Sequence, residues 1–173
     1  MRYVLTIGGH GTRLKGISPV DKHLLYYKNK RIVEWMKEII PTIEIIGEEK
    51  TNSRKETLKQ IRHYENCVIV DCDIIPFGLS EVSFTEDTLL CFHSTKQKYG
   101  SIICEEGKLK EANEGVSISN LKCSGVYFVS SVDKLLNSMK DENSIAKGMI
   151  GAQVMLEKSF IRLGDVEDYM EAL

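Results

Sequence analysis

The sequence lacks the long apolar runs that membrane-spanning helices need. No stretch approaches the roughly 20 apolar residues that cross a bilayer, so we expect no membrane partner. The first apolar run, residues 3–7, is also too short for the core of a secretory signal. The sequence therefore predicts a cytoplasmic protein.

Basic charge is not in excess either. The 23 lysines and arginines are matched by 25 aspartates and glutamates, which gives a formal net charge of −2. A chain without a general basic surface gives no reason to expect a nucleic-acid partner. A local positive cleft for a small anionic ligand is compatible with this balance.

Paired cysteines are missing as well. The five cysteines are odd in number and scattered, without the spacing of metal ligands, so we expect buried, reduced thiols. Of the 173 residues, 42% are hydrophobic and 28% are charged, as in soluble globular proteins. The length suits one domain of ordinary size, which we place over residues 1–173.

Apolar strands alternate with helical patterns in the first half of the chain. Strands are predicted over residues 3–7, 43–46 and 67–70, with helices over 30–40 and 53–63. Ser53 and Glu56 have the spacing of a capping box at the start of the second helix. This β-α-β-α-β order predicts an α/β fold: a Rossmann-like, mixed but mostly parallel sheet flanked by helices.

The second half is richer in strands. Apolar and β-branched runs predict strands over residues 89–92, 101–104, 108–112 and 125–129, and helices over 132–139 and 165–173.

A glycine-rich turn follows the first predicted strand and reads Gly8-Gly9-His10-Gly11-Thr12-Arg13. Glycines let backbone N–H groups approach phosphate closely, and an arginine adds bidentate charge. The loop fits neither the P-loop pattern nor the dinucleotide pattern, whose third glycine is replaced by Leu14. The alternative is a tight turn with a surface arginine.

Two carboxylates, Asp71 and Asp73, follow the third predicted strand. Alternate residues at a strand end project to the same side, so both can face one site. Magnesium prefers such hard oxygen ligands, combined with phosphate oxygens. The alternative is that both aspartates are polar residues that begin a loop.

The glycine loop resembles the signature of the sugar-phosphate nucleotidyltransferases, G-x-G-T-R-L followed by P-K-P-L-L. Lys22-His23-Leu24-Leu25 supplies the second part, and Asp21 and His23 replace the two prolines. The resemblance implies the nucleotide-diphospho-sugar transferase type of fold. It also implies an enzyme that joins an NTP to a phosphorylated small acceptor and releases pyrophosphate.

The resemblance also implies roles for individual residues. Arg13 and Lys22 would be catalytic, and Asp73 would hold Mg²⁺, with Asp71 as a second ligand or a supporting group. The nucleotide phosphates would be bound by Gly8, Gly9, Gly11, Thr12 and Arg13. The acceptor would be bound by Gly100, Glu114 and Gly125, which occupy family motif positions.

Three positions on the acceptor side depart from the family pattern. Gly115 replaces a lysine that would hold the acceptor's phosphate, and Cys123 replaces an asparagine. Arg162 replaces an aspartate that in many relatives is the second metal ligand, and Asp165 is an alternative ligand nearby. These changes leave turnover itself open.

Several alternatives therefore remain at this point. The acceptor is a sugar 1-phosphate or a phospho-alcohol such as phosphocholine. A degenerate nucleotide-binding regulatory homologue without turnover is a second hypothesis, and an NDP-sugar-dependent glycosyltransferase is a third. The sequence identifies neither the nucleobase nor the acceptor, and it leaves a homodimer open.

Overall fold

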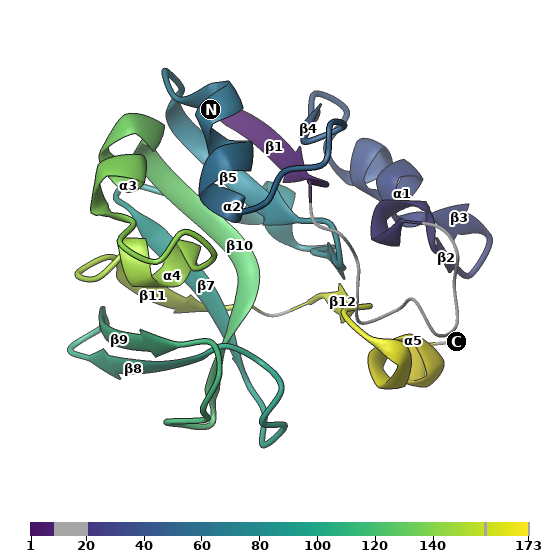
Figure 1. Ribbon diagram of the computed structural model, residues 1–173. Helices are drawn as coiled ribbons and strands as arrows, with labels where there is room; N and C mark the ends of the chain where they lie inside the picture. The colour runs from purple at the N-terminus through teal and green to yellow at the C-terminus, as the bar shows by residue number, and fades with distance from the viewer. Residues whose placement is uncertain (9–20, 158, 173) are drawn as a thin grey trace.

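The computed structural model of the protein describes residues 1–8, 21–157 and 159–172. Four residues predicted to bind phosphate, Gly9, Gly11, Thr12 and Arg13, lie outside these ranges. An 8-stranded sheet with the order β4-β1-β5-β10-β7-β11-β9-β8 forms the centre of the described chain (Figure 1). Its strands are β1 Arg2–Thr6, β4 Glu44–Ile46, β5 Glu65–Asp71, β7 Thr88–His93, β8 Ser101–Glu105, β9 Lys108–Asn113, β10 Leu121–Ser131 and β11 Gln153–Leu156.

The first half forms the expected β-α-β-α-β unit. Strands β4 and β5 both pair with β1 in parallel, so that Leu5 lies opposite Ile45 on one side and Val70 on the other. Helix α1 (Ile32–Ile39) connects β1 to β4, and α2 (Arg54–Leu58) leads into β5. Residues of β1 and β5 are apolar on both faces because helices cover both sides of a parallel sheet.

The second half turns the sheet into a mixed one. Strand β10 runs antiparallel to both β5 and β7, whereas β11 is parallel to β7. The pairing of β10 with β7 is interrupted between Cys123 and Tyr127. Gly125 lies in this interruption with a φ of +96°, a left-handed conformation that glycine adopts readily. The predicted mixed, Rossmann-like α/β architecture is confirmed.

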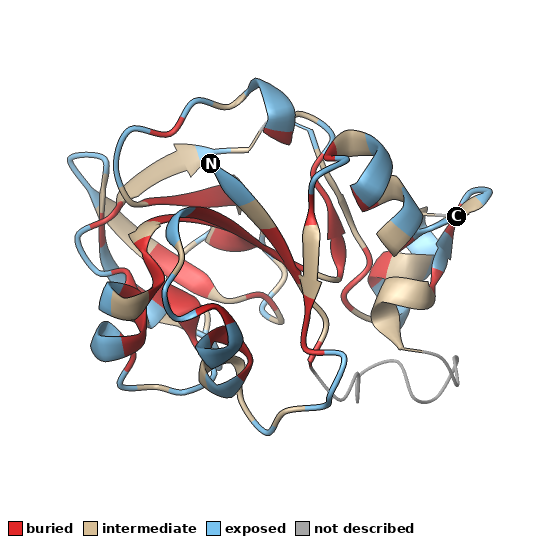
Figure 2. Cartoon of the chain, turned by 90° about the horizontal axis from the view of Figure 1, so that it is seen from above, coloured by how far each residue is buried: buried red, intermediate tan, exposed pale blue. Residues whose placement is uncertain are grey.

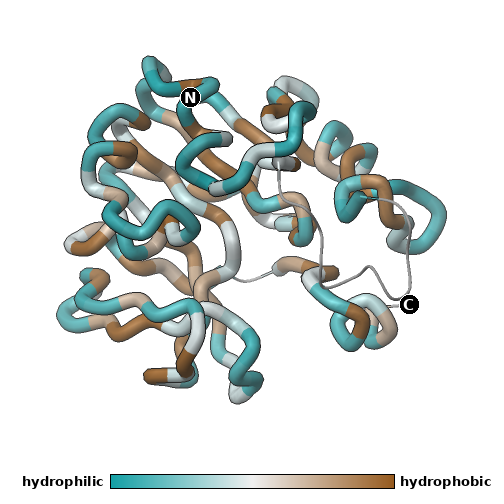
Figure 3. Tube along the Cα trace, viewed as in Figure 1, coloured by the Kyte–Doolittle hydropathy of each residue, from teal (hydrophilic) through white to brown (hydrophobic). Residues whose placement is uncertain are grey.

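Two apolar cores lie on opposite faces of the sheet. One contains Met36 of α1 and is joined by Tyr169 of α5 (Val166–Ala172). The other contains Leu58 of α2, Leu135 of α3 (Val132–Ser138) and Ile145 of α4 (Ile145–Gly148). Figure 2 shows the buried strands between helices whose outer surfaces are exposed, and Figure 3 shows the same division in hydropathy. No described helix has the length and apolar character needed to cross a membrane.

The structure differs from the predicted elements at several points. Helix α2 ends at Leu58 and continues as a 3₁₀ turn, Lys59–Ile61, so it is shorter than expected. Ser53 caps it by accepting a hydrogen bond from the Glu56 amide at 3.1 Å. The Glu56 carboxylate accepts from the amide of Asn52 instead, so only half of the predicted capping box forms.

Two very short strands, β6 (Ile74–Ile75) and β12 (Ile161–Arg162), were not predicted from the sequence. They pair in antiparallel fashion outside the main sheet, with Arg162 opposite Ile74. A two-residue strand is too short to show periodicity. This pairing brings the C-terminal segment next to the residues that follow β5. Arg162 is thereby placed close to Asp73 in the chain's fold.

Candidate active site

The candidate site lies where the parallel strands β1 and β5 end. Asp71 is the last residue of β5, and Asp73 lies two residues further on. The hydroxyl of Thr6, at the end of β1, donates to the carbonyl of Val70 at 3.2 Å and ties the two strand ends together. The carboxyl edge of such a sheet is where ligands bind in open α/β folds.

Asp73 forms a buried ion pair with Lys22, which comes from the 3₁₀ helix η2 (Lys22–Leu24). The Nζ–Oδ2 distance is 3.0 Å, and the side chains are only 11% and 8% exposed. Lys22 also donates to the carbonyl of Gly164 at 2.8 Å. Burial alone would raise the pKa of Asp73, but the charges of Lys22 and Arg162 outweigh it and hold that pKa well below its usual range.

The second aspartate has a different partner. Arg54, the first residue of α2, contacts Asp71 at 2.9 Å, and the charge of Asp71 is the main reason that the pKa of Arg54 is raised. Arg54 also approaches the hydroxyl of Tyr127 at 3.5 Å. Gly125 packs on Asp71, because an added Cβ would lie 3.0 Å from its Oδ2.

Arg162 is the third cation near the two aspartates. Its Nη1 donates to the carbonyls of Ser124 at 3.1 Å and Cys123 at 3.3 Å. The guanidinium carbon lies 4.6 Å from the centre of the Tyr99 ring, in cation–π distance. Burial alone would lower the pKa of Arg162, but the charges of Asp73 and Asp71 raise it.

Gly164 is the meeting point of these groups. An added Cβ would lie 3.2 Å from Oδ2 of Asp73 and 3.4 Å from Nε of Arg162. Oδ2 of Asp168, from α5, would lie 3.3 Å away. A methyl group at this position would therefore be tight, and the three neighbouring side chains would have to shift slightly to admit it.

Asp165, the alternative metal ligand suggested by the sequence, contacts Lys98 and α5. It forms an ion pair with Lys98 at 2.8 Å and accepts a hydrogen bond from the amide of Asp168 at 3.0 Å. Lys98 and the hydroxyl of Tyr99 both bind the Asp168 carboxylate. These contacts fasten α5 to the segment before β8.

Two of the three predicted acceptor residues lie together. Gly100 faces Glu114 so closely that a Cβ would come within 2.7 Å of Oε2. The other carboxylate oxygen of Glu114 accepts from the hydroxyl of Ser144 at 2.8 Å, a contact that the sequence did not indicate. Gly125 instead lies against Asp71.

Of the predicted phosphate-binding residues, Gly8 is the one that lies in the described part of the chain. An added Cβ there would clash with the hydroxyls of Thr57 and Thr51, at 2.6 and 2.8 Å. Both threonines come from the segment that leads into and forms α2, so the start of the glycine loop packs directly on this segment. Gly47, which follows β4 and has a φ of +87°, packs on the backbone of Gly8, because an added Cβ would lie 2.6 Å from the Gly8 nitrogen.

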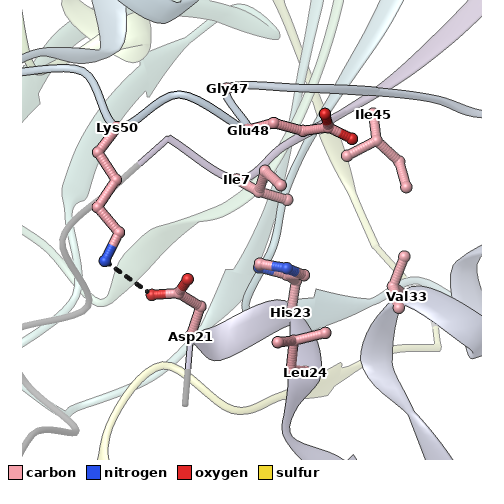
Figure 4. A pocket seen from close by; sticks show the side chains of 9 residues that line it. All are labelled: Ile7, Asp21, His23, Leu24, Val33, Ile45, Gly47, Glu48 and Lys50. Atoms are coloured by element: carbon pink, nitrogen blue, oxygen red, sulfur yellow. Dashed lines mark ion pairs between the residues drawn. The ribbon is translucent and has the colours of Figure 1, made fainter. Parts of the chain in front are cut away.

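A pocket of about 320 Å³ adjoins Gly47 on the α1 side of the sheet (Figure 4). Its apolar wall consists of Ile7, Leu24, Val33 and Ile45. Its rim carries the ion pair of Lys50 with Asp21, at 3.2 Å, and the carboxylate of Glu48. His23 points into it, and burial lowers the pKa of its imidazole. Among the described residues that line this pocket, one lysine faces two carboxylates, a charge balance that does not suit a phosphate.

A divalent cation fits this site only in part. The Oδ1 atom of Asp73 is buried without a hydrogen-bond partner among the described residues, as a ligand oxygen would be. Within residues 1–8, 21–157 and 159–172, no group of three or more acidic, histidine or cysteine side chains is arranged to hold a metal. Asp73 is therefore suited to a Mg²⁺ ion whose other ligands are phosphate oxygens and water.

No protein-family model matches the chain, and no curated protein matches its sequence. Solved structures do match, and they share the fold of sugar-phosphate nucleotidyltransferases. The chain superposes on the CTP:phosphocholine cytidylyltransferase of Streptococcus pneumoniae with a TM-score of 0.79 and 13% identity, over 98% of this chain and 96% of that one.

Two further structures have the same fold. One is the nucleoside-diphosphate-sugar pyrophosphorylase of Vibrio cholerae, with a TM-score of 0.72 and 13% identity over 99% of each chain. The other is the inositol-1-phosphate CTP transferase of T. maritima, with a TM-score of 0.68 and 11% identity over 96% of this chain and 90% of that one. At these identities the likeness establishes the fold.

Proposed function

We propose that the protein is a nucleotidyltransferase that joins an NTP to a phosphorylated small acceptor and releases pyrophosphate. The observation that carries this proposal is the cluster of Lys22, Asp73 and Arg162 at the carboxyl end of β5. In this fold, such a cluster lies where ligands bind. The similar structures are described as acting with CTP, phosphocholine, inositol 1-phosphate or sugar nucleotides, which supports the same reaction class.

The proposed reaction needs no protein nucleophile. A phosphate oxygen of the acceptor attacks the α-phosphorus and forms the new P–O bond. The bond to the bridging oxygen breaks, and pyrophosphate leaves with its electron pair. The protein contributes positioning and charge neutralisation, which are the main terms in phosphoryl-type transfer. Preorganised charges of this kind supply roughly 3–4 kcal/mol each.

Lys22 is the residue best placed to neutralise charge at the reacting phosphates. Its ammonium group is paired with Asp73 and the Gly164 carbonyl, so it is held at the site before any ligand binds. We propose that a bound nucleotide draws this ammonium to a phosphate oxygen. Asp73 would then be available to hold Mg²⁺, whose charge would polarise the phosphates.

The other parts of the site follow from the sequence and stay proposals. The triphosphate would be held by Gly8, Gly9, Gly11, Thr12 and Arg13. Glu114, held by Ser144 against Gly100, would accept hydrogen bonds from the acceptor. Asp71 supports the site through Arg54 and is a weaker candidate for a metal ligand, because both of its oxygens have partners, Arg54 and the Thr6 hydroxyl. Oδ1 of Asp73, by contrast, has no hydrogen-bond partner among the described residues. The cytoplasmic location and a homodimer stay predictions.

Pyrophosphate release tests this proposal directly. The full chain is incubated with each NTP, Mg²⁺ and a panel of sugar 1-phosphates, phosphocholine and polyol phosphates. We expect release to require one NTP and one acceptor together, with neither sufficient alone. Release from an NTP without an acceptor would indicate a hydrolase and contradict the proposal.

A nucleotide-binding protein without turnover is the second candidate function. Arg162 favours it, because the charge of this cation acts on Asp73, and the described residues contain no group of three or more metal-binding side chains. Thermal-shift measurements with the same NTPs separate the two. Stabilisation by one NTP, with no pyrophosphate from any acceptor, would favour this candidate.

A further inference from the structure

The buried guanidinium of Arg162 has no ion-pair partner among the described residues. Asp73 is paired with Lys22 at 3.0 Å and Asp71 with Arg54 at 2.9 Å, so each aspartate has a closer cation than Arg162. Residues 9–20, outside the described ranges, contain no aspartate or glutamate. The contacts of Arg162 are carbonyl oxygens and an aromatic ring.

The charge of Arg162 also acts on a third carboxyl group, that of Glu157. Glu157 is not within ion-pair distance of the guanidinium, and its Oε2 atom is buried without a hydrogen-bond partner among the described residues. Burial raises the pKa of Glu157 to about 7, which weakens its negative charge near neutral pH. The three cations of the cluster therefore face two aspartates, and positive charge is in excess.

One donor of the Arg162 guanidinium is unused. Its Nε atom is buried and has no hydrogen-bond partner in the described part of the chain. A buried donor that makes no hydrogen bond destabilises a folded protein. Hydrogen bonds from Nη1 to the carbonyls of Cys123 and Ser124, together with the Tyr99 ring, fix the orientation of the guanidinium in a cluster where positive charge is in excess, so the group is held ready for an anion.

We infer that Arg162 binds the phosphoryl group of the acceptor as the third cation of the cluster that contains Lys22 and Asp73. Arginine is suited to this because its planar fork matches two phosphoryl oxygens at once. Its fixed positive charge would lie beside the reacting phosphates, in addition to any charge brought by Mg²⁺ at Asp73. The excess of positive charge in the cluster follows from the structure, and the identity of the phosphate carrier rests on the proposed function.

Binding of two anions to the full chain without turnover tests the inference. Inorganic phosphate represents the acceptor's phosphoryl group, and pyrophosphate represents the nucleotide's phosphates. We expect Arg162→Gln to raise the Kd for inorganic phosphate at least about tenfold, as for loss of a charged hydrogen bond, and the Kd for pyrophosphate less than about threefold. An unchanged phosphate Kd, or an equal loss for both anions, would overturn it.

Two further variants make this result decisive. Arg62→Gln is the matched control, because Arg62 is 61% exposed and pairs with Asp133 far from the cluster; it should leave both Kd values unchanged. Arg162→Lys keeps the charge but loses the fork, so its phosphate Kd should rise at least about threefold. If Arg162→Gln does not fold, an unaltered phosphate Kd in Arg162→Lys overturns the inference.

Kinetics separates this inference from the proposed function. If the wild-type protein turns over, Arg162→Gln should raise KM for the acceptor and leave KM for the NTP within about twofold; the reverse pattern would assign Arg162 to the nucleotide. If the wild type releases no pyrophosphate, the proposed function fails, and the phosphate-binding result still decides the role of Arg162.

Discussion

The Lys22–Asp73 ion pair should contribute measurably to stability, and a double-mutant cycle with Lys22→Met and Asp73→Asn measures this contribution. Removing one partner of a buried pair typically costs about 3–5 kcal/mol. Here Arg162 still acts on Asp73, and Gly164 still offers Lys22 a carbonyl. We therefore expect about 2–3 kcal/mol for each single variant and a coupling energy of about 1–2 kcal/mol.

The assay is urea unfolding followed by the fluorescence of Trp35, the single tryptophan. The pKa of Asp73 is lowered in the folded protein, so the stabilisation is fully present above the unfolded-state value of about 3.9 and is lost as the pH falls through the folded-state pKa. The coupling should therefore be constant between pH 5 and pH 8, both chosen as assay conditions well above about 3.9.

The exposed pair of Lys30 and Glu38 is the matched control. Its side chains are 42% and 56% exposed, so the cycle of Lys30→Met and Glu38→Gln should give no more than about 0.5 kcal/mol. A coupling for the buried pair as small as that of this control would refute the reasoning. So would a coupling that is already lost at about pH 5, since it would place the folded pKa of Asp73 near or above its ordinary value.

Three further predictions concern Glu157, Gly125 and Gly100. The pKa of Glu157 is about 7 when folded against an ordinary 4.5, so the stability of the wild type should fall as the pH rises between these values. The free energy of unfolding of Glu157→Gln, relative to that of the wild type, should therefore increase by about 1–3 kcal/mol between pH 4.5 and pH 8. A difference that does not change with pH would contradict this. Gly125→Ala should lower the free energy of unfolding in urea by about 1–3 kcal/mol. Gly151→Ala is the control, because Gly151 has a φ of +93°, close to the +96° of Gly125, but no neighbour within 4 Å, so its loss should be smaller. Equal losses would exclude a cost from the contact with Asp71. Gly100→Ala should displace Glu114 and raise KM for the acceptor at least about tenfold without changing KM for the NTP, and an unchanged acceptor KM would remove this pair from the binding site.

The positions of Lys22 and Asp73 in the fold were partly predictable from sequence. The strand that ends at Asp71 is a buried, β-branched run with a clear boundary. Lys22 and Asp73, 51 residues apart, were singled out by their motifs, and the structure brings them to 3.0 Å. Their proximity follows from topology, because parallel strands bring their carboxyl ends to one edge.

The surroundings of Arg162 were not predictable in the same way. Its position in the sequence marked a departure from the family pattern, but its partners, the carbonyls of Cys123 and Ser124, are 39 and 38 residues away. They meet through the two-residue strand β12, which is too short to produce a periodic pattern. The pair of Glu114 and Ser144 is similar, because it depends on the short helix α4, for which no signal was found in the sequence.

The central claim is that Lys22 and Asp73 serve nucleotidyl transfer, and the most direct test is kcat for pyrophosphate release. With the NTP and acceptor that the wild type uses, we predict that Lys22→Ala and Asp73→Ala each lower kcat at least about 100-fold, while circular dichroism shows the fold to be intact. Near-normal kcat in either folded variant would contradict the account.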